Sequence, residues 1–351
     1  MSPAGPVVVT GGAGFIGAGV VRHLRGAGHR VTVLDSLRED VHRDGGAAAR
    51  ARLSSEGVPL CVVDARELEA VSRAVDGAEA VVHLAAKVGL GVDLADMDDY
   101  VSSNDLGTAV VLRACAAAGV PRFVQASSMV VYGEGRYTCS THGLVPPAPR
   151  ARVALQHRQF EPPCLRCGQP LEAGLVEEGA PLDPRNTYAV SKVAQEHLAS
   201  VWARETGAAA VSLRLHNVYG PGMPRNTPYA GVAAIFSSSL DRGEAPRVFE
   251  DGGQRRDFVH VDDIGAAFGA AVEAASTGHR AYNVGSGVVS TVGDMARALA
   301  RVRQGPDPVV TGEFRLGDVR HITASSERIA AELGWRAEMR LEDGVRDLRF
   351  D

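Results

Sequence analysis

The chain has 351 residues, 45% of them hydrophobic and 23% charged, which is enough for one large or two ordinary domains with packed cores. A formal net charge of −5 provides no basic surface for nucleic acid or anionic lipid, and no apolar run approaches the roughly 20 residues of a membrane helix. With five cysteines and no secretory signal, we expect a cytoplasmic protein with reduced thiols and neither nucleic-acid nor membrane partners.

Strand and helix patterns alternate along the first part of the chain. Amphipathic helical patterns at 15–27 and 103–118 lie between short runs of β-branched residues, which are typical of buried strands. These runs are 7–10, 30–35, 60–64, 80–86, 122–128 and 210–215. The alternation predicts a Rossmann-like α/β domain over 1–215, with a doubly wound parallel sheet. Residues 216–351, with shorter mixed elements, are expected to form a smaller α/β substrate domain.

A glycine-rich turn joins the first strand to the first helix. In "VVVTGGAGFIG", Gly11, Gly14 and Gly17 follow the strand and open the helix, with Phe15 and Ile16 between them. Glycine permits a tight turn and close approach of a pyrophosphate, and the helix N-terminus supplies N–H groups for the anion. The motif and its context predict a dinucleotide site.

Two carboxylates follow at the ends of the second and third strands. Asp35 can accept both ribose hydroxyls of an adenosine and repel a 2′-phosphate, which favours NAD over NADP. Arg38 is close enough to leave that preference open, although a solvated loop cation is the favoured interpretation. Asp64, followed by Ala65, could contact the adenine amino group or cap the next helix, and both alternatives stay open.

A Tyr-x-x-x-Lys pair begins the helical pattern after Asn186, which is a predicted helix cap. Tyr188 and Lys192 lie one helical turn apart on one face, and Lys87 and Lys192 are the only lysines among 37 basic residues. An ammonium beside a phenol, helped by a nicotinamide cation, lowers a tyrosine pKa from about 10 toward neutrality. Such a tyrosine is a general base for a hydroxyl whose carbon loses hydride, and a general acid in reverse.

Two serines end the fifth strand, and their side chains should point to opposite faces. Ser128 is expected to hydrogen-bond the reacting oxygen. Ser127, on the opposite face of the strand, is expected to have a structural role instead.

Several motifs together resemble the extended short-chain dehydrogenase/reductase family, in its sugar-nucleotide epimerase and dehydratase branch. They are "TGGAGFIG", "HLAA", "SSMVVYG", "YAVSK", "LRLHNVYGPG" and "RRDFVHVDD", and the likeness covers nearly the whole chain outside 135–180. It is closest to UDP-galactose 4-epimerase-like enzymes and, more narrowly, to enzymes described as dTDP-L-rhamnose 4-epimerases. The resemblance implies bound NAD, inversion at C4 of a dTDP- or UDP-linked hexose, and a homodimer. A one-way dehydrogenase or 4-ketoreductase and a non-catalytic NAD-binding protein are the alternatives.

The resemblance also assigns roles to residues at matching positions. It implies that Ser128, Tyr188 and Lys192 are catalytic. Further implied substrate contacts are Asn217, Arg256 and Arg315 at the nucleotide diphosphate and Asp318 at the nucleoside ribose. A loop over the cofactor is implied for Leu84, Ala85, Ala86 and Lys87, with Lys87 near the nicotinamide ribose and Asn104 tying the sheet together nearby.

One departure from the family's dehydratases bears on the reaction. Dehydrating members carry carboxylates after the serine motif, where this chain has Met129 and Val130. Without such a base, abstraction of the C5 proton is disfavoured. Epimerisation at C4 needs no such carboxylate.

The segment 135–180 contains two short metal-ligand pairs. Cys139 and His142 are followed, after 21 intervening residues, by Cys164 and Cys167. Two such pairs with a spacer predict a tetrahedral structural zinc site, with free thiols or a redox pair as alternatives and His157 as a rival fourth ligand. We expect this zinc-knuckle insertion to order a loop that shapes the wall of the sugar pocket.

Overall fold

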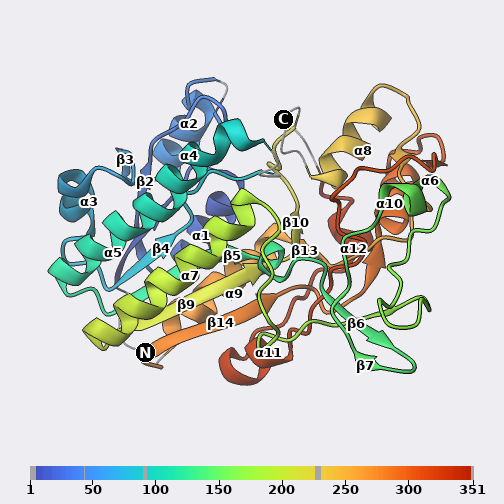
Figure 1. The fold of residues 1–351 in the computed structure, drawn as a ribbon. Coiled ribbons are helices and arrows are strands. Elements are labelled where there is room, and N and C mark those ends of the chain that lie inside the picture. The colour runs from blue at the N-terminus through green and yellow to red at the C-terminus, as the bar shows by residue number, and fades with distance from the viewer. Residues whose placement is uncertain (1–4, 43, 90–92, 226–230, 275, 349–351) are drawn as a thin grey trace.

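The computed structural model describes residues 5–42, 44–89, 93–225, 231–274 and 276–348 (Figure 1). At its centre lies a seven-stranded sheet in the order β14-β9-β5-β4-β1-β2-β3, in which all neighbouring strands are parallel. The strands are β1 (Pro6–Thr10), β2 (Arg30–Asp35), β3 (Leu60–Val62), β4 (Ala80–His83), β5 (Arg122–Ser128), β9 (Ala209–Leu215) and β14 (Gly278–Val284). The predicted Rossmann-like α/β architecture is confirmed.

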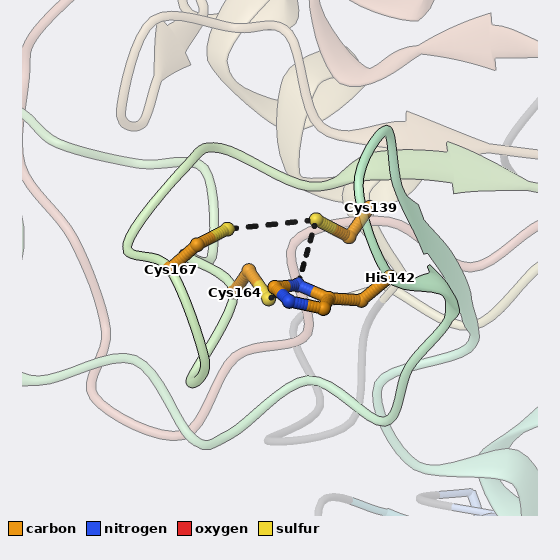
Figure 2. Close-up of side chains that lie close together, drawn as sticks. All are labelled: Cys139, His142, Cys164 and Cys167. Carbon is orange, nitrogen blue, oxygen red and sulfur yellow. Dashed lines mark hydrogen bonds between the residues drawn. The ribbon is translucent and has the colours of Figure 1, made fainter.

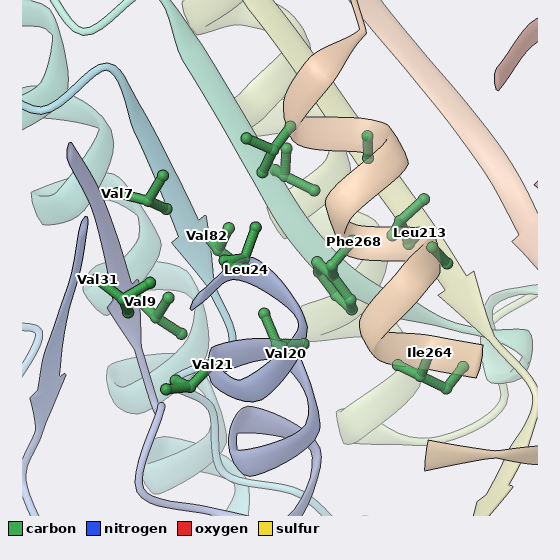
Figure 3. Close-up of a cluster of buried hydrophobic side chains, with 14 of the residues drawn as sticks. Val7, Val9, Val20, Val21, Leu24, Val31, Val82, Leu213, Ile264 and Phe268 are labelled. Atoms are coloured by element: carbon green, nitrogen blue, oxygen red, sulfur yellow. The ribbon is translucent and has the colours of Figure 1, made fainter. Parts of the chain in front are cut away.

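Helices cover both faces of this sheet. One face packs against α1 (Phe15–Gly26), α2 (Ala47–Ser55), α9 (Val261–Glu273) and α11 (Glu327–Leu333), and the other against α3 (Leu68–Val75), α5 (Gly107–Ala118) and α7 (Thr187–Thr206). Val7 and Val9 belong to the first core and Val8 to the second, because successive strand side chains point to opposite faces. Figure 3 shows the first core, where Leu24 and Phe268 meet strand side chains. Burial on both faces explains the continuous apolar runs in the sequence.

The sheet layer takes its edge strand β14 and the helix α9 from beyond residue 215. In space, α9 packs directly against α1. The predicted domain boundary at residue 215 therefore assigns β14 and α9 to the second domain. In the structure, both pack with elements of the first domain, β14 beside β9 and α9 against α1.

The rest of the C-terminal part forms a smaller body beside the sheet (Figure 1). Its core lies between α8 (Val232–Asp241), α10 (Val292–Arg303) and α12 (Leu341–Gly344). Short strand pairs complete it: β10 (Asn217–Tyr219) with β13 (Phe258–His260), β11 (Arg247–Val248) with β16 (Val309–Val310), and β12 (Arg255–Arg256) with β15 (Ser290–Thr291).

The 135–180 segment is an ordered insertion. It contains β6 (Arg136–Cys139), β7 (Gly143–Leu144), α6 (Arg152–Gln156) and β8 (Glu172–Gly174), and its strands form an antiparallel sheet in the order β7-β6-β8. Tyr137, Cys139 and Cys164 contribute to a small core of its own.

The helical stretch expected at 103–118 starts earlier and is not uniform. It runs from α4 (Met97–Tyr100) through a π-helical turn at Val101–Leu106 into α5. Such widened turns are rare and frequently lie at functional sites. No described helix combines the length and apolar character needed to cross a membrane.

Candidate active site

A cavity of about 1050 Å³ opens where β1, β2, β4, β5 and β9 end and the smaller body begins. Both groups of predicted ligand-binding residues line it. From the cofactor group these are Gly11, Gly14, Phe15, Ile16, Gly17, Asp35, Asp64, Ala65, Leu84, Ala85, Ala86, Lys87, Tyr188 and Lys192, and from the substrate group Ser128, Asn217, Arg256, Arg315 and Asp318. Asn104 is the predicted site residue absent from this described lining.

The three glycines of the first turn have different structural requirements. Gly11 has φ +70°, and a Cβ there would lie 2.6 Å from the Ala85 nitrogen. A Cβ on Gly17 would collide with the backbone of Gly11 and Gly12. At Gly14, the N-cap of α1, a Cβ would meet only the Gly11 carbonyl, at an ordinary 3.5 Å. The packing of the protein itself therefore does not require glycine at 14, and the absent side chain leaves open space at the N-terminus of α1.

Asp35 links the first two turns at the edge of the cavity. Its Oδ2 accepts a hydrogen bond from the Ala13 amide at 3.0 Å, and its Oδ1 accepts one from the Leu37 amide at 2.9 Å. These bonds fix the carboxylate at the end of β2, where it can accept ribose hydroxyls.

Arg38 is neither a free solvated cation nor available for a 2′-phosphate. Its guanidinium donates to Asp99 at 2.9 Å and to Asp40 at 3.0 Å, and the hydrogen bonds from Asp99 and then Asp40 raise its pKa. The two carboxylates neutralise the one charge that would have attracted a phosphate.

Of the two alternatives for Asp64, the structure excludes the helix cap. Its carboxylate accepts hydrogen bonds from the Arg66 amide at 2.9 Å and from the Arg66 guanidinium. Helix α3 begins at Leu68, with Glu67 at its N-cap, so Asp64 does not cap it. Asp64 remains on the cavity wall.

Lys87 and Asn104 hold the loop after β4. The Lys87 ammonium pairs with Asp99 at 2.8 Å and Asp96 at 3.3 Å. Although burial lowers the pKa of Lys87, these two carboxylates outweigh it and raise the pKa. Asn104, fully buried in the π-helical turn, accepts from the Lys87 amide at 2.7 Å and donates to its carbonyl at 3.0 Å and to Ser191 at 2.8 Å. Asn104 thus ties the loop after β4 to α7.

Ser128, Tyr188 and Lys192 come together at one point of the cavity. Ser128 ends β5, while α7 begins with the predicted cap, in which Asn186 Oδ1 accepts from the Ala189 amide at 2.8 Å. Tyr188 is hydrogen-bonded to the Ser128 side chain. The Lys192 Nζ lies 5.8 Å from the centre of the Tyr188 ring and donates to the Ala126 carbonyl at 2.9 Å.

Burial has the largest effect on the pKa values of Tyr188 and Lys192. Burial raises the pKa of Tyr188 to about 12, against the opposing effect of the Ser128 hydrogen bond. Burial also lowers the pKa of Lys192 to about 8, with Glu196 and Asp105 opposing it. Burial thus favours the neutral phenol, and a positive charge brought close to Tyr188 would lower its pKa.

Ser127 has the structural role expected from strand alternation. Its hydroxyl donates to Glu196 Oε1 at 2.5 Å, and Glu196 pairs with Arg214 at 2.7 Å, with both charged side chains buried. This contact joins β5, α7 and β9 close to Ser128 and Lys192. No local sequence spacing reveals the Glu196–Arg214 pair, because its members lie on different elements, α7 and β9.

The substrate side of the cavity contains polar atoms without protein partners. Among the described residues, Asn217 Oδ1, Gln254 Oε1 and both ring nitrogens of His216 are buried and lack hydrogen-bond partners. Burial of such atoms is costly unless a ligand or water satisfies them. His216 and Gln254 were missed by the sequence analysis, although they lie beside the motifs that contain Asn217 and Arg256.

Arg256 lines the cavity and makes no ion pair in the described structure. Its guanidinium donates to the carbonyls of Val319 at 2.7 Å, Arg255 at 2.8 Å and Arg320 at 3.0 Å. Those acceptors are neutral, although the Asp318 and Glu250 carboxylates lie near enough to act on the guanidinium electrostatically. The guanidinium can still contribute positive charge to the binding of an anionic ligand. Arg315 lies over the Phe249 ring at 5.3 Å, and the apolar side chains of Ile235 and Phe236 line the same half of the cavity.

Met129 and Val130 line the cavity directly after Ser128. The carboxylates in the described lining lie elsewhere, at Asp35, Asp40 and Asp64 on the cofactor side and at Glu313 and Asp318 on the smaller body. Among the described residues, the wall formed by Met129 and Val130 is thus apolar and carries no carboxylate that could abstract a proton.

The insertion brings its four predicted ligands into one cluster (Figure 2). His142 Nδ1 lies 3.5 Å from the sulfurs of Cys139 and Cys164, and the Cys139 and Cys167 sulfurs are 3.7 Å apart. All four ligand atoms lie within 4.8 Å of one another, and His157 is not part of the cluster. Cys61 and Cys115 lie apart from it, on β3 and α5.

The insertion does not form a wall of the cavity. None of the described lining residues lies between 135 and 180, so that expectation was wrong. The insertion packs instead on the far side of the segments that carry Arg256 and Asp318, through Arg150 and Glu161.

Comparisons with known proteins agree with this geometry. Residues 7–285 match the model of the NAD dependent epimerase/dehydratase family. The chain belongs to this family. It is 32% identical to a dTDP-L-rhamnose 4-epimerase from Burkholderia thailandensis over 345 residues, covering 98% of this chain and 93% of the relative. It is 31% identical to a UDP-glucose 4-epimerase from Mycolicibacterium smegmatis, covering 96% and 95% of the two chains.

A solved structure of an epimerase shares the fold. The crystal structure of a UDP-glucose 4-epimerase from Thermus thermophilus in complex with NAD superposes with a TM-score of 0.76 at 32% identity, covering 97% of each chain. The epimerase/dehydratase family likeness therefore extends over both bodies of the molecule.

Proposed function

We propose that this protein is an NAD-dependent epimerase that inverts C4 of a nucleotide-linked hexose. One observation carries the proposal: Ser128, Tyr188 and Lys192 converge in the same cavity as the glycine turn and the Arg256 guanidinium. The apolar wall at Met129 and Val130 favours epimerisation over dehydration, since dehydration needs a base there.

Each reacting side chain has one task in this reaction. Tyr188 takes the proton from the C4 hydroxyl as C4 loses a hydride, and later returns it to the same oxygen. Ser128 donates a hydrogen bond to that oxygen, and Lys192 adds the positive charge that favours phenolate. NAD held by the glycine turn and Asp35 would supply the hydride acceptor for C4 and the hydride donor for its opposite face.

The residues of the cofactor side fit NAD. Gly14 leaves space at the α1 N-terminus, and Asp35 is fixed where a ribose can meet it. Because Arg38 is already paired with Asp40 and Asp99, we infer a preference for NAD over NADP.

The residues of the smaller body fit a nucleoside diphosphate. Arg256 and Arg315 supply positive charge, Asn217 offers an unsatisfied carbonyl oxygen, and Asp318 can accept ribose hydroxyls. Its apolar side chains can cover a base. A dTDP-linked hexose such as dTDP-L-rhamnose is our first candidate, by similarity to the Burkholderia relative.

The Cys139–His142–Cys164–Cys167 cluster fits a structural zinc ion. Zinc bonds of about 2.3 Å to sulfur and about 2.0 Å to nitrogen place tetrahedral ligand atoms roughly 3.5 to 3.8 Å apart. The distances of 3.5 and 3.7 Å match these edges. Four protein ligands leave no open position, which favours a structural over a catalytic metal. Zinc thiolates require reduced cysteines, in keeping with the proposed cytoplasmic location.

A homodimer is the proposed assembly. Large apolar side chains are exposed on the π-helical turn and on α7, with Leu106 and Val190 each 51% exposed. A second copy covering these helices would bury them.

Incubation with a panel of dTDP-, UDP- and GDP-hexoses, without added NAD, tests the proposal. We expect NMR to show C4 inversion of one of them to an equilibrium mixture. Conversion that requires added cofactor and stops at a ketone or alcohol would favour the dehydrogenase or ketoreductase. Bound NAD without any turnover across the panel would favour a non-catalytic protein.

A further inference from the structure

The insertion contacts the segments of the substrate side through two charged residues, Arg150, whose side chain is buried, and Glu161, whose side chain is 40% exposed. The Arg150 guanidinium donates to Glu250 at 2.8 Å, to the Phe160 carbonyl at 3.3 Å and to the Asp318 carbonyl at 2.6 Å. The Arg150 and Glu250 side chains are only 4% and 2% exposed. One side chain of the insertion thus holds two segments of the smaller body together.

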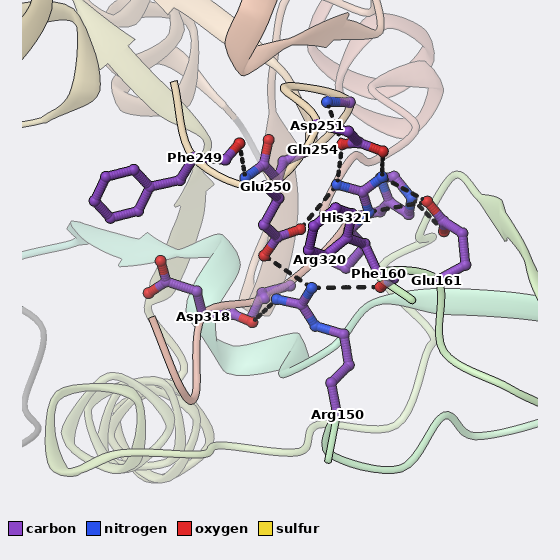
Figure 4. A network of polar contacts seen from close by, with 12 residues as sticks. Arg150, Phe160, Glu161, Phe249, Glu250, Asp251, Gln254, Asp318, Arg320 and His321 are labelled. Carbon is purple, nitrogen blue, oxygen red and sulfur yellow. Dashed lines mark hydrogen bonds and ion pairs between the residues drawn. The ribbon is translucent and has the colours of Figure 1, made fainter. Parts of the chain in front are cut away.

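Glu161 makes a second connection (Figure 4). Its Oε1 accepts from Arg320 at 2.7 and 2.9 Å, and its Oε2 lies 2.8 Å from His321 Nε2. Arg320 also pairs with Glu250 and Asp251, each at 2.8 Å. Arg150, Glu250, Arg320 and Glu161 therefore form a continuous chain of charge pairs, which we call the strut.

The strut supports backbone that faces the cavity. Arg320 and Val319 provide two of the three carbonyls that hold the Arg256 guanidinium. Glu250 has φ +53°, a conformation that is strained for a residue other than glycine and needs support from its surroundings. Its neighbour Phe249 lines the cavity beneath Arg315.

We propose that the insertion positions the diphosphate-binding side of the cavity, with Arg150 and Glu161 as positioning residues that never touch the substrate. Arg150 fixes the segments around Glu250 and Asp318 relative to each other. Glu161 fixes Arg320, whose carbonyl in turn orients Arg256. This inference rests on the proposed sugar-nucleotide substrate. The reacting residues lie on β5 and α7 and have no contact with the strut in the described structure.

The central experiment compares Arg150→Met with Arg152→Met in the full-length holoenzyme. Arg152 is an exposed arginine on α6 of the same insertion and makes no hydrogen bond or ion pair in the described structure, so it is a matched control. For Arg150→Met we expect KM for the sugar nucleotide to rise about tenfold or more while kcat changes by less than about twofold. For Arg152→Met we expect both constants unchanged.

Two further variants keep the test decisive. Arg150→Lys keeps a cation beside Glu250, but a lysine ammonium lacks the planar fork by which the Arg150 guanidinium also reaches the Asp318 carbonyl. Its KM should therefore lie between those of the wild type and Arg150→Met. Glu161→Gln preserves volume and removes the charge, and it replaces Arg150→Met if that variant fails to fold. Its KM should also rise with kcat preserved.

The outcomes are distinguishable from failure of the proposed function. A wild-type enzyme that turns over no sugar nucleotide contradicts the function. A wild-type enzyme that is active, with folded Arg150→Met and Glu161→Gln variants of unchanged KM, overturns the strut. A fall in kcat without a rise in KM would also overturn it, because the effect would then lie at the reacting residues.

Discussion

Replacing Gly14 with alanine separates cofactor binding from folding. The backbone at Gly14 has φ −72° and ψ 178°, which alanine adopts readily, and an added Cβ would meet only the Gly11 carbonyl at 3.5 Å. Alanine is a poorer N-cap than glycine but reduces the entropy of the unfolded chain. We therefore expect the free energy of unfolding of cofactor-free Gly14→Ala to stay within about 1 kcal/mol of the wild type.

The same methyl group should weaken NAD binding strongly. It projects at the α1 N-terminus, where the pyrophosphate must approach the backbone. Overpacking of one carbon costs about 1 to 3 kcal/mol, which corresponds to a loss of roughly 5- to 150-fold in affinity. Isothermal titration of the cofactor-free protein with NAD measures this loss, and denaturant unfolding measures stability.

Gly17→Ala is the matched comparison within the same turn. Its Cβ collides with the backbone of Gly11 and Gly12, so this variant should lose about 1 to 3 kcal/mol or more of stability without any ligand. The reasoning fails if Gly14→Ala binds NAD like the wild type. It also fails if Gly14→Ala is destabilised as much as Gly17→Ala.

Four further predictions concern the reacting residues, the substrate side and the insertion. Tyr188→Phe should lower kcat for epimerisation by about 10² to 10⁴ while NAD remains bound, as measured by turnover and by cofactor content of the purified protein. In the folded, cofactor-free protein the pKa of Lys192 is lowered from 10.5 to about 8. Between these two pH values the unfolded chain therefore binds more protons than the folded protein, and Lys192 makes the free energy of unfolding rise with pH. Between pH 7.5 and 10 the unfolding free energy of the wild type should therefore gain about 2 to 3 kcal/mol relative to Lys192→Met, and parallel pH profiles for the two proteins would contradict this. His216→Phe removes two unsatisfied ring nitrogens, so it should raise the melting temperature and also raise KM; a lower melting temperature would show that the ring has partners in solution. Cys164→Ser should abolish bound zinc, measured by elemental analysis, and lower the melting temperature, whereas Cys115→Ser should leave the metal content unchanged.

Local sequence patterns predicted six of the seven strands of the sheet, without the edge strand β14, and the helix that carries Tyr188 and Lys192. Continuous apolar runs predicted the strands because the sheet is buried on both faces, and the cap at Asn186 is where the pattern placed it. The ends of two strands were predicted less accurately. β3 ends at Val62 and β4 at His83, before the predicted ends, because the following residues leave the sheet to line the cavity. Apolar character alone does not distinguish a strand from such a lining segment.

Local sequence patterns did not predict ion pairs between residues that are distant in the sequence. Arg38 and Lys87 were read as loop and cofactor cations, yet both pair with Asp99, which belongs to α4. The acidic run "DLADMDD", which contains Asp99, was the one feature of the sequence that could have indicated partners for these two cations. Similarly, the function of the insertion depended on Arg150 meeting Glu250, a contact across 100 residues that no local spacing encodes.

Two separate buried charge networks support the two halves of the cavity. Glu196 and Arg214, joined to Ser127, fix α7 to β5 and β9, and thereby hold Tyr188 next to Ser128. The strut holds the diphosphate side and shares no residue with this first network. An epimerase must hold the diphosphate firmly while the hexose turns over in front of the reacting groups, so the two halves have different mechanical requirements. Substitutions at Glu196 should therefore affect kcat, whereas substitutions in the strut should affect KM, and double variants across the two networks should be additive because the sites share no partner.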